Sequence, residues 1–353
     1  MREAPLDPWT SLKARTLPLV SRLRRGAPAP SDVFDEAELQ AVAPVICLPG
    51  QLARATAGVP GFAPLADEIA AIEATELAHM PLARRVIRNA LVHEAGVDAW
   101  AEGRRIGTLG PGAFRAPRVR LARASYPMTR VTATYFGHWL TDACRTALLS
   151  SPEETLLLPI PAAWPHASEY CAAFGFPTPP DLPVFVDRLT LYEDVSTGRS
   201  GRARIEVLRS RLLDRFGASS TGGLVYLRRG SSGARRLISN EAEVINALSP
   251  FGVVCLDVEG ASVETLVRTL AGARLVVSIE GSHQAHAQIA LAPGAGLLSL
   301  IPADRFSAVH AGMARARGLA FGLVVIEPGA EGYRVDLADL TATVEQMVAS
   351  PRG

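Results

Sequence analysis

Short runs of β-branched residues and leucine recur at regular intervals from residue 222 onward. Glycine or turn residues bound each run, and the runs are GLVYLR (223–228), GVVCLD (252–257), RLVVSI (274–279), GLLSLI (296–301) and GLVVIE (322–327). Helix-compatible segments lie between them, at 240–249, 262–272, 282–291 and 305–317. Continuous apolar strands that alternate with helices are typical of a parallel sheet with both faces covered. The C-terminal half is therefore predicted to be a Rossmann-like domain.

The N-terminal half also alternates between strand-like and helix-like segments. Residues 84–107 predict a β-hairpin that turns near Glu94 to Gly96. After it we predict a helix at 137–149, a strand at 155–159, a helix that ends at Gly175 and a strand at 183–192. This order indicates a second α/β domain. The polar, glycine-bearing segment 194–202 is the predicted linker, and a helix over 203–216 is predicted to open the second domain.

These patterns divide the chain into an N-terminal arm (1–30), an N-terminal α/β domain (31–200) and a C-terminal Rossmann-like domain (201–353). Two Rossmann-like domains that face each other place a ligand in the cleft, at the carboxyl ends of the C-terminal strands. Within the arm, residues 12–25 carry five basic residues and no acid. This basic segment is either a solvated arm or a peripheral contact with an anionic membrane surface.

Composition excludes several classes of protein. The 353 residues are 48% hydrophobic and 20% charged with a net charge of +1, which excludes wholesale disorder and argues against a nucleic-acid binder. Lys13 is the only lysine, so neither a phosphate-loop hydrolase nor a Schiff-base enzyme fits. The four cysteines form no Cys-x-x-Cys pair, which indicates a reducing compartment and predicts a cytoplasmic protein. No apolar stretch reaches 18 residues, so we expect no membrane span.

The segment YFGHWLTDA (135–143) is the first candidate for chemistry. His138 and Asp142 are four residues apart and share one face of a helix, and Trp139 offers a flat surface beside them. A carboxylate one turn from an imidazole can orient it or act as a base itself. The alternative interpretation is a local His–Asp pair beside a core tryptophan.

The second candidate follows the strand that ends at Leu227. Four arginines, Arg228, Arg229, Arg235 and Arg236, precede Asn240 at the start of the next helix. Guanidinium groups bind phosphate bidentately and keep their charge, so this loop predicts an anion site. A solvated basic loop is the alternative.

The third candidate is the turn Glu280, Gly281, Ser282 and His283, where a strand meets a helix. A helix start presents free N–H groups to an anion, and Ser282 is predicted to cap it. His283 and His286 have metal-like spacing but lack a third ligand, so we predict no metal.

The three motifs, HWLTD, YLRR-x5-RRLISNEAEVI and VVSIEGSH, together resemble glycosyltransferase family 61, in the family's order and across about residues 84–327. The resemblance implies a GT-B fold and transfer of a sugar from a nucleotide-sugar donor, with inversion, to a glycan or lipid-linked glycan acceptor. It implies a part in capsule, exopolysaccharide or lipopolysaccharide assembly, at the cytoplasm or the inner membrane face. No cofactor is expected, because the sequence has no Asp-x-Asp pair for a metal.

Residue by residue, the resemblance assigns donor binding to Arg228, Arg236, Asn240 and Gly281. It also assigns the acceptor-facing helix to the residues around Trp139. An inverting transfer needs a base, and either His138 or Asp142 fills that role.

One position departs from the family. Many members read His-Gly-Ala where this chain reads Glu280-Gly281-Ser282, and a carboxylate repels a diphosphate unless it faces hydroxyl groups or pairs with His283. Two alternative functions remain: a non-catalytic carbohydrate-assembly protein with the same fold, and a nicotinamide-dependent oxidoreductase. The second lacks the Gly-x-Gly-x-x-Gly motif after any strand.

Overall fold

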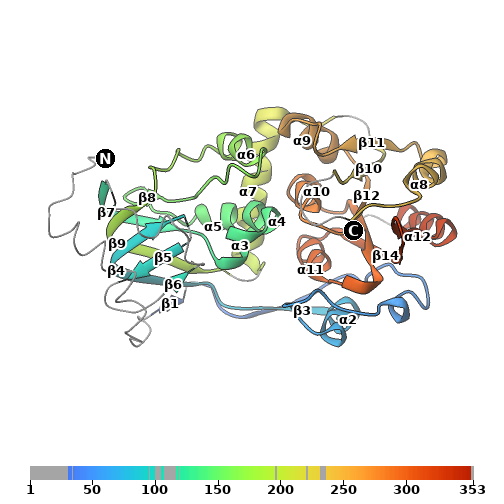
Figure 1. Cartoon of the computed structure of the whole chain (residues 1–353), viewed down its shortest axis with the longest axis horizontal. Helices are drawn as coiled ribbons and strands as arrows, with labels where there is room; N and C mark the ends of the chain where they lie inside the picture. Colours follow the sequence, from blue (N-terminus) through green and yellow to red (C-terminus); the bar gives the residue numbers. More distant parts are fainter. Residues whose placement is uncertain are drawn as a thin grey trace. The chain divides into compact units, whose positions relative to one another are not determined.

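The computed structural model forms two compact units, each described here by itself (Figure 1). Unit 1 consists of Met1–Glu38 and Met80–Ile205. Unit 2 consists of Leu39–His79 and Glu206–Gly353. The structure describes residues 31–33, 35–94, 96–99, 105–106, 117, 119–194, 197–219, 222–230 and 236–350. The basic segment 12–25 and Arg235 therefore lie outside the described residues. No helix among those described is long and apolar enough to cross a membrane.

Unit 1 is built on a mixed seven-stranded sheet. Its strands are β1 (Ser31–Val33), β4 (Ala83–His93), β5 (Gly96–Ala99), β6 (Arg105–Ile106), β7 (Val119–Tyr126), β8 (Thr155–Leu156) and β9 (Val184–Glu193). They are ordered β6-β5-β4-β9-β7-β8, with β1 paired to β4. The pair β4–β5 is the hairpin predicted from residues 84–107. Because β4 is antiparallel to β9 while β7 is parallel to it, the sheet is not doubly wound. Unit 1 is α/β as predicted, but its sheet is not Rossmann-like.

The helices of unit 1 are α3 (Arg130–Thr134), α4 (Phe136–His138), the π-helix η3 (Trp139–Ala143), α5 (Cys144–Ala147) and α6 (Ala167–Phe174). Thr129 begins α3 with a capping box formed with Thr132. Gly175 ends α6 in the left-handed conformation, at φ 69°, which suits glycine. Trp139, Tyr170 and Phe174 are fully buried and anchor this helical layer.

Unit 2 contains the predicted parallel sheet. Its strands are β10 (Leu224–Arg228), β11 (Val254–Asp257), β12 (Leu275–Ile279), β13 (Gly296–Pro302), β14 (Ala320–Gly329) and β15 (Gly332–Arg334). The order is β11-β10-β12-β13-β14-β15, parallel except for β15. All five predicted strands are confirmed. The strand order reverses between β10 and β12, the position where open parallel sheets bind ligands at the carboxyl ends of their strands.

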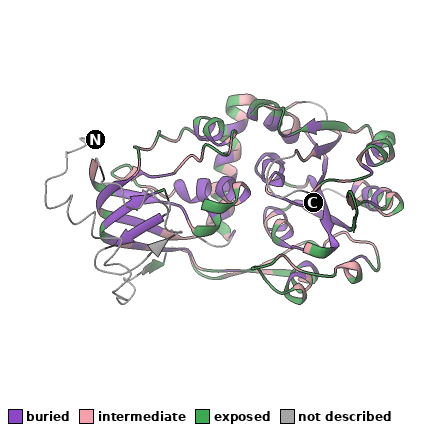
Figure 2. Cartoon of the chain, viewed as in Figure 1, coloured by how far each residue is buried: buried purple, intermediate pink, exposed green. Residues whose placement is uncertain are grey.

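Helices cover both faces of this sheet (Figure 1). On one face, α8 (Glu241–Leu248) and α12 (Leu337–Ala349) enclose a core that includes Leu224, Val277 and Leu300. The remaining helices are α9 (Val263–Ala271), α10 (Gln284–Ala290) and α11 (Val309–Ala316), with the 3-10 turns η4 (Ser249–Phe251) and η5 (Ala303–Arg305). The strands are mostly buried (Figure 2), as expected for continuous apolar runs.

Residues 39–79, which the sequence analysis assigned to the N-terminal domain, belong to unit 2. They contribute β2 (Glu38–Ala41), η1 (Leu52–Arg54), α2 (Leu65–Glu73) and β3 (Glu76–His79). The buried Arg315 explains this placement, because it donates hydrogen bonds to Ala43, Ala71, Ile72 and Ala74. Backbone bonds from Ile46 to β14 extend the attachment.

The second boundary also differs from the prediction. Helix α7 (Arg199–Phe216) begins inside the segment 194–202 that was predicted as a linker, and the unit boundary falls within this helix, after Ile205. Arg204 and Ile205 belong to unit 1, whereas Glu206 onward belongs to unit 2. The first turn of α7 is polar and contains glycine, so its composition resembles that of a loop. The helix predicted from the sequence therefore began four residues too late, at 203.

Candidate functional site

The predicted helix around His138 contains a π-helical turn. Residues Trp139–Ala143 adopt it between α4 and α5. Such wider turns are rare and occur frequently at functional sites. Trp139 is fully buried, stacks on Phe136 and donates its indole N–H to the carbonyl oxygen of Pro159 at 3.0 Å. The tryptophan is therefore a core residue and does not present the flat surface that the sequence predicted.

His138 and Asp142 form the pair that their spacing predicted. Nδ1 of His138 lies 2.7 Å from Oδ2 of Asp142, and both side chains are about one-quarter exposed. A carboxylate accepts only, so Nδ1 carries the proton and Nε2 keeps its lone pair. Among the described residues, Nε2 has no hydrogen-bond partner. This arrangement makes the imidazole the available base and the carboxylate its orienting partner.

The other side of Asp142 faces a buried cation. Nη2 of Arg145 lies 3.8 Å from Oδ1 of Asp142, and the Thr141 hydroxyl lies 3.2 Å from the same oxygen. Arg145 is 1% exposed and is itself held by Asp194, which also pairs with Arg204. The network fixes the helix that carries the His–Asp pair.

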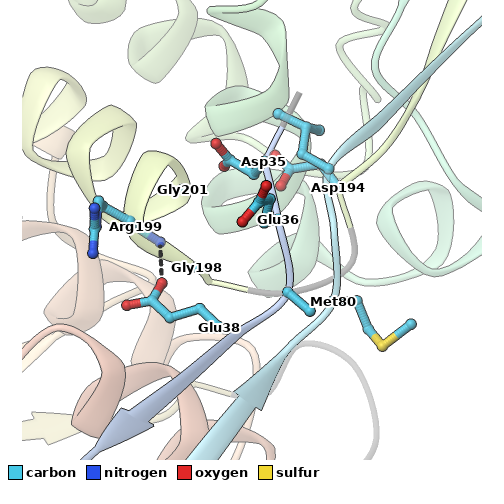
Figure 3. Close-up of a pocket in the computed structure, with 10 residues that line it drawn as sticks. Asp35, Glu36, Glu38, Met80, Asp194, Gly198, Arg199 and Gly201 are labelled. Atoms are coloured by element: carbon cyan, nitrogen blue, oxygen red, sulfur yellow. Dashed lines mark hydrogen bonds between the residues drawn. The ribbon is translucent and has the colours of Figure 1, made fainter. Parts of the chain in front are cut away.

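Asp194 also borders a cavity of about 220 Å³ in unit 1 (Figure 3). Acidic side chains dominate its lining. Asp35, Glu36 and Glu38 lie on the segment that leads from unit 1 to unit 2. The backbone N–H of Arg199 donates to Glu38 at 2.8 Å, which ties the first turn of α7 to that segment. Neither His138 nor Asp142 lines this cavity.

In unit 2, three guanidinium groups converge on the carboxyl edge of the parallel sheet. Arg229 follows β10, Arg236 comes from the loop before α8, and Arg305 ends η5 after β13. Glu280 follows β12 between them. Glu259 also faces Arg229, so three cations and two carboxylates leave one net positive charge at the position where the strand order reverses, which favours an anionic ligand.

Glu280 is buried and paired within this cluster. Arg236 donates through Nη1 to both the carbonyl oxygen, at 2.7 Å, and the carboxylate of Glu280. Arg305 Nε and His310 Nε2 lie 3.8 and 3.7 Å from the same carboxylate. The carboxylate thus pairs with arginine, and not with His283 as the sequence analysis considered. Its charge is neutralised from within, which reduces its repulsion of an anion.

Arg229 lies directly against Gly281. A Cβ at this glycine would collide with Nη1 of Arg229 and would lie 3.2 Å from Nη1 of Arg236. Its φ of 154° also lies in the region that favours glycine. Burial and the neighbouring charge of Arg236 lower the pKa of Arg229 to about 10, so it stays cationic at neutral pH. Burial likewise lowers the pKa of Arg236. Gly281 is required because the two guanidinium groups occupy its side-chain space.

His283 is buried behind the arginines. The Ser278 hydroxyl donates to the carbonyl oxygen of Leu227 at 2.8 Å and lies 2.7 Å from Nε2 of His283, so Nε2 carries the proton. Nδ1 has no hydrogen-bond partner among the described residues. Burial, followed by the charge of Arg229, lowers the pKa of His283 well below its usual value. His283 is therefore a neutral acceptor beside the cationic cluster.

Several predicted donor residues take other roles. Asn240 is buried and exchanges two 3.0 Å hydrogen bonds with the backbone of Val335, which fixes the loop against β15. Arg228 pairs with Glu241 at 3.1 Å. Ser282 does not cap α10, whose N-cap is His283 without a side-chain hydrogen bond. That helix is too short for its N-terminus to count as an anion site by itself.

Sequence reasoning missed Arg305 and His310. Arg305 lies three residues after Pro302, the last residue of β13. Once the strand order is known, this spacing predicts that Arg305 lies at the carboxyl edge of the sheet. His310 is the second residue of α11, and its Nδ1 lies 3.0 Å from Nε2 of Gln288. Among the described residues, no group of three or more His, Cys, Asp or Glu side chains is arranged to hold a metal ion.

The sequence model of the family described as Glycosyltransferase 61 matches residues 136–298. This span contains His138, Asp142, the arginine loop and the Glu280 turn. No curated protein matches the chain. Among solved structures, a match with a TM-score of 0.25 and 12% identity covers 54% of this chain and 49% of the metal-soaked Flv1 flavodiiron core from Synechocystis sp. PCC6803. The chain thus spans about half the length of that structure. The resemblance drawn from the sequence is confirmed over residues 136–298, the part of the chain that carries the glycosyltransferase 61 region.

Proposed function

We propose that this protein is a glycosyltransferase that moves a sugar from a nucleotide-sugar donor to a glycan acceptor, with inversion at the anomeric carbon. The observation that carries the proposal is the convergence of Arg229, Arg236 and Arg305 where the strand order of unit 2 reverses. Nucleotide diphosphates are the leaving groups of such donors, and a half-buried cluster of three guanidinium groups with a net positive charge complements one.

The arginines stabilise the charge that develops on the departing diphosphate. Arg229 and Arg305 supply guanidinium groups, and Arg236 is held in place by Glu280. Preorganised cations do this work without rearranging during the reaction, so we propose that transfer does not require a divalent metal. Charge-assisted hydrogen bonds to phosphate are worth about 1.5 to 3 kcal/mol each.

His138 is the proposed general base. Its Nε2 removes the proton from the acceptor hydroxyl as that oxygen attacks the anomeric carbon and the bond to the diphosphate breaks. Asp142 holds the ring through Nδ1 and stabilises the imidazolium that forms. The resemblance to family 61 extends this proposal to surface-polysaccharide assembly in the cytoplasm, on a glycan or lipid-linked glycan.

Release of free nucleotide diphosphate from a panel of nucleotide sugars, with and without candidate acceptors, tests the proposal. We expect release with at least one donor, an unchanged rate within a few-fold in excess EDTA, and inverted configuration of the product by NMR. Donor binding without release from any donor would favour the non-catalytic alternative. A rate abolished by EDTA and restored by Mn²⁺ would overturn metal independence.

A further inference from the structure

A row of three arginines crosses the sheet of unit 1. Arg88 on β4 is the register partner of Arg188 on β9, and Arg188 is the register partner of Arg123 on β7. Register partners share one face of the sheet, and neighbouring strands are about 4.8 Å apart. All three residues are exposed. Like charges placed directly opposite each other destabilise a sheet, so the row needs a physical explanation.

Acidic residues pair with only one of the three arginines among the described residues. Arg188 and Arg88 form no ion pair or side-chain hydrogen bond with any described residue. Arg123 pairs with Glu153, and both of these side chains are largely exposed, so the pair is weak. On the same face, Arg84 pairs with Asp32, which is 64% exposed.

Two residues of the row, Arg123 and Arg188, line a polar cavity of about 160 Å³, and Arg88 flanks it as the register partner of Arg188. Its lining residues are Arg84, Val86, Arg123, Ser151, Glu154, Arg188 and Thr190. Both carboxylate oxygens of Glu154 are already occupied, one by the Thr190 hydroxyl and the other by the backbone N–H of Ser151 at 3.1 Å. Glu154 therefore holds the loop after α5 against the sheet and keeps its charge. Four arginines on this face, Arg84, Arg88, Arg123 and Arg188, stand against the three carboxylates of Asp32, Glu153 and Glu154, which leaves one net positive charge.

We propose that this cavity, the arginine-row site, binds a phosphate or diphosphate ester. Guanidinium groups match phosphate oxygens in bidentate geometry, and Arg188, which has no acidic partner among the described residues, offers its guanidinium to a compact anion beside Arg84 and Arg123. A recessed site beside Glu153 and Glu154 fits a discrete ligand better than a flat anionic surface. The site lies within unit 1 and does not depend on the reaction proposed above, because it shares no residue with the arginine cluster of unit 2.

Arginine labelling with phenylglyoxal, read by peptide mass spectrometry, tests the site because it reports each arginine separately. We expect pyrophosphate to slow the labelling of Arg88 and Arg188 at least fivefold. This protection should persist in Arg236→Ala, where the unit 2 cluster is impaired. In the double variant Arg88→Gln/Arg188→Gln, calorimetry on the Arg236→Ala background should show at least tenfold weaker binding of pyrophosphate. Arg215→Gln, which removes one exposed arginine on α7, is the control and should bind normally.

The same variants distinguish the source of the phosphate. A free phosphate ester predicts protection by inorganic phosphate and pyrophosphate and no sedimentation with phosphatidylglycerol vesicles. A lipid-borne phosphate predicts sedimentation that the double variant loses, together with protection by pyrophosphate. Protection confined to Arg229, Arg236 and Arg305, or sedimentation with vesicles without any protection by pyrophosphate, would overturn the arginine-row site. Normal melting temperatures are expected for Arg215→Gln and for the substitutions at Arg88 and Arg188, because these side chains are exposed. Arg236→Ala should lower the melting temperature, because it leaves the buried Glu280 without its partner.

Discussion

Asp142 holds the Nδ1 atom of His138 at 2.7 Å and leaves Nε2 of the imidazole without a partner among the described residues. The sequence left both residues open as the base. The carboxylate already accepts from Nδ1 and from the Thr141 hydroxyl and lies 3.8 Å from Arg145, whereas the lone pair of Nε2 is uncommitted. The geometry therefore favours histidine as the base and aspartate as the orienting residue.

Substitution of this pair should separate the two roles. At saturating donor, His138→Ala should lower kcat about 10² to 10⁴-fold, the range typical of a general base, and Asp142→Asn should lower it less. Exogenous imidazole should rescue part of the rate in His138→Ala only. A larger loss for Asp142→Asn would reverse the roles. Normal turnover in both variants, with a lowered melting temperature alone, would show that the pair is a structural cap.

Affinity for a nucleoside diphosphate should depend on the charges of the arginine cluster in unit 2. Arg236→Ala removes one cation and leaves Glu280 without its closest partner. Binding of a nucleoside diphosphate should weaken about tenfold to a hundredfold, because a charge-assisted hydrogen bond is lost. Glu280→Gln should instead tighten binding, since it removes the carboxylate and keeps the shape. Calorimetry on folded protein checks both, and weaker binding in Glu280→Gln would mean that the carboxylate itself contacts the ligand.

Gly281 provides a steric test of the same cluster. The substitution Gly281→Ala places a methyl group in the space of the Arg229 guanidinium and forces a side chain to adopt φ 154°. We expect donor affinity to fall at least tenfold. Gly312→Ala is the matched control, because a Cβ there meets no atom within 4 Å. Equal donor affinities in the two variants would contradict the placement of Arg229.

The contrast between the two units explains how much of the fold the sequence predicted. In unit 2, β12 and β13 are continuous apolar runs bounded by turns, so their local pattern and their buried environment agree. In unit 1, the strand β7, with the sequence VRLARASY, was not predicted. It has no long apolar run, because arginines such as Arg123 interrupt it. Strand direction in a mixed sheet depends on long-range pairing, which no local pattern encodes.

The candidate sites show the same limit. His138 and Asp142 were predictable because both lie within one helical turn. The sequence did not show that the amide of Asn240 bonds the backbone of Val335, nearly a hundred residues away. Arg305 was missed because only the order of β10, β12 and β13 brings its short turn beside Arg236. Residues joined by tertiary contacts require the fold before their chemistry can be read.

His283 gives a prediction for stability against pH. Its pKa is lowered in the folded protein, chiefly by burial and then by Arg229, with His286, His310 and Arg236 also facing it. In the unfolded chain this histidine binds a proton near its ordinary pKa of about 6.5, whereas in the folded protein it stays neutral. Protonation therefore stabilises the unfolded state relative to the folded state as pH falls below 6.5. This residue should therefore destabilise the fold by up to about 1.4 kcal/mol for each pH unit below 6.5.

The measurement is urea unfolding of the full chain at pH 7.5, 6.5 and 5.5, for the wild type and His283→Gln. Far-ultraviolet circular dichroism is the required signal, because His283 lies in unit 2 and tryptophan fluorescence would report on unit 1. All four tryptophans, Trp9, Trp100, Trp139 and Trp164, belong to unit 1. At pH 7.5 the variant should be less stable, since it disturbs a packed side chain and its contact with Ser278. The difference should shrink at pH 5.5, where only the wild type bears the cost of an uncharged buried imidazole. His166→Gln in unit 1 is the control, and a stability difference that stays constant between pH 7.5 and 5.5 would contradict a neutral, buried His283.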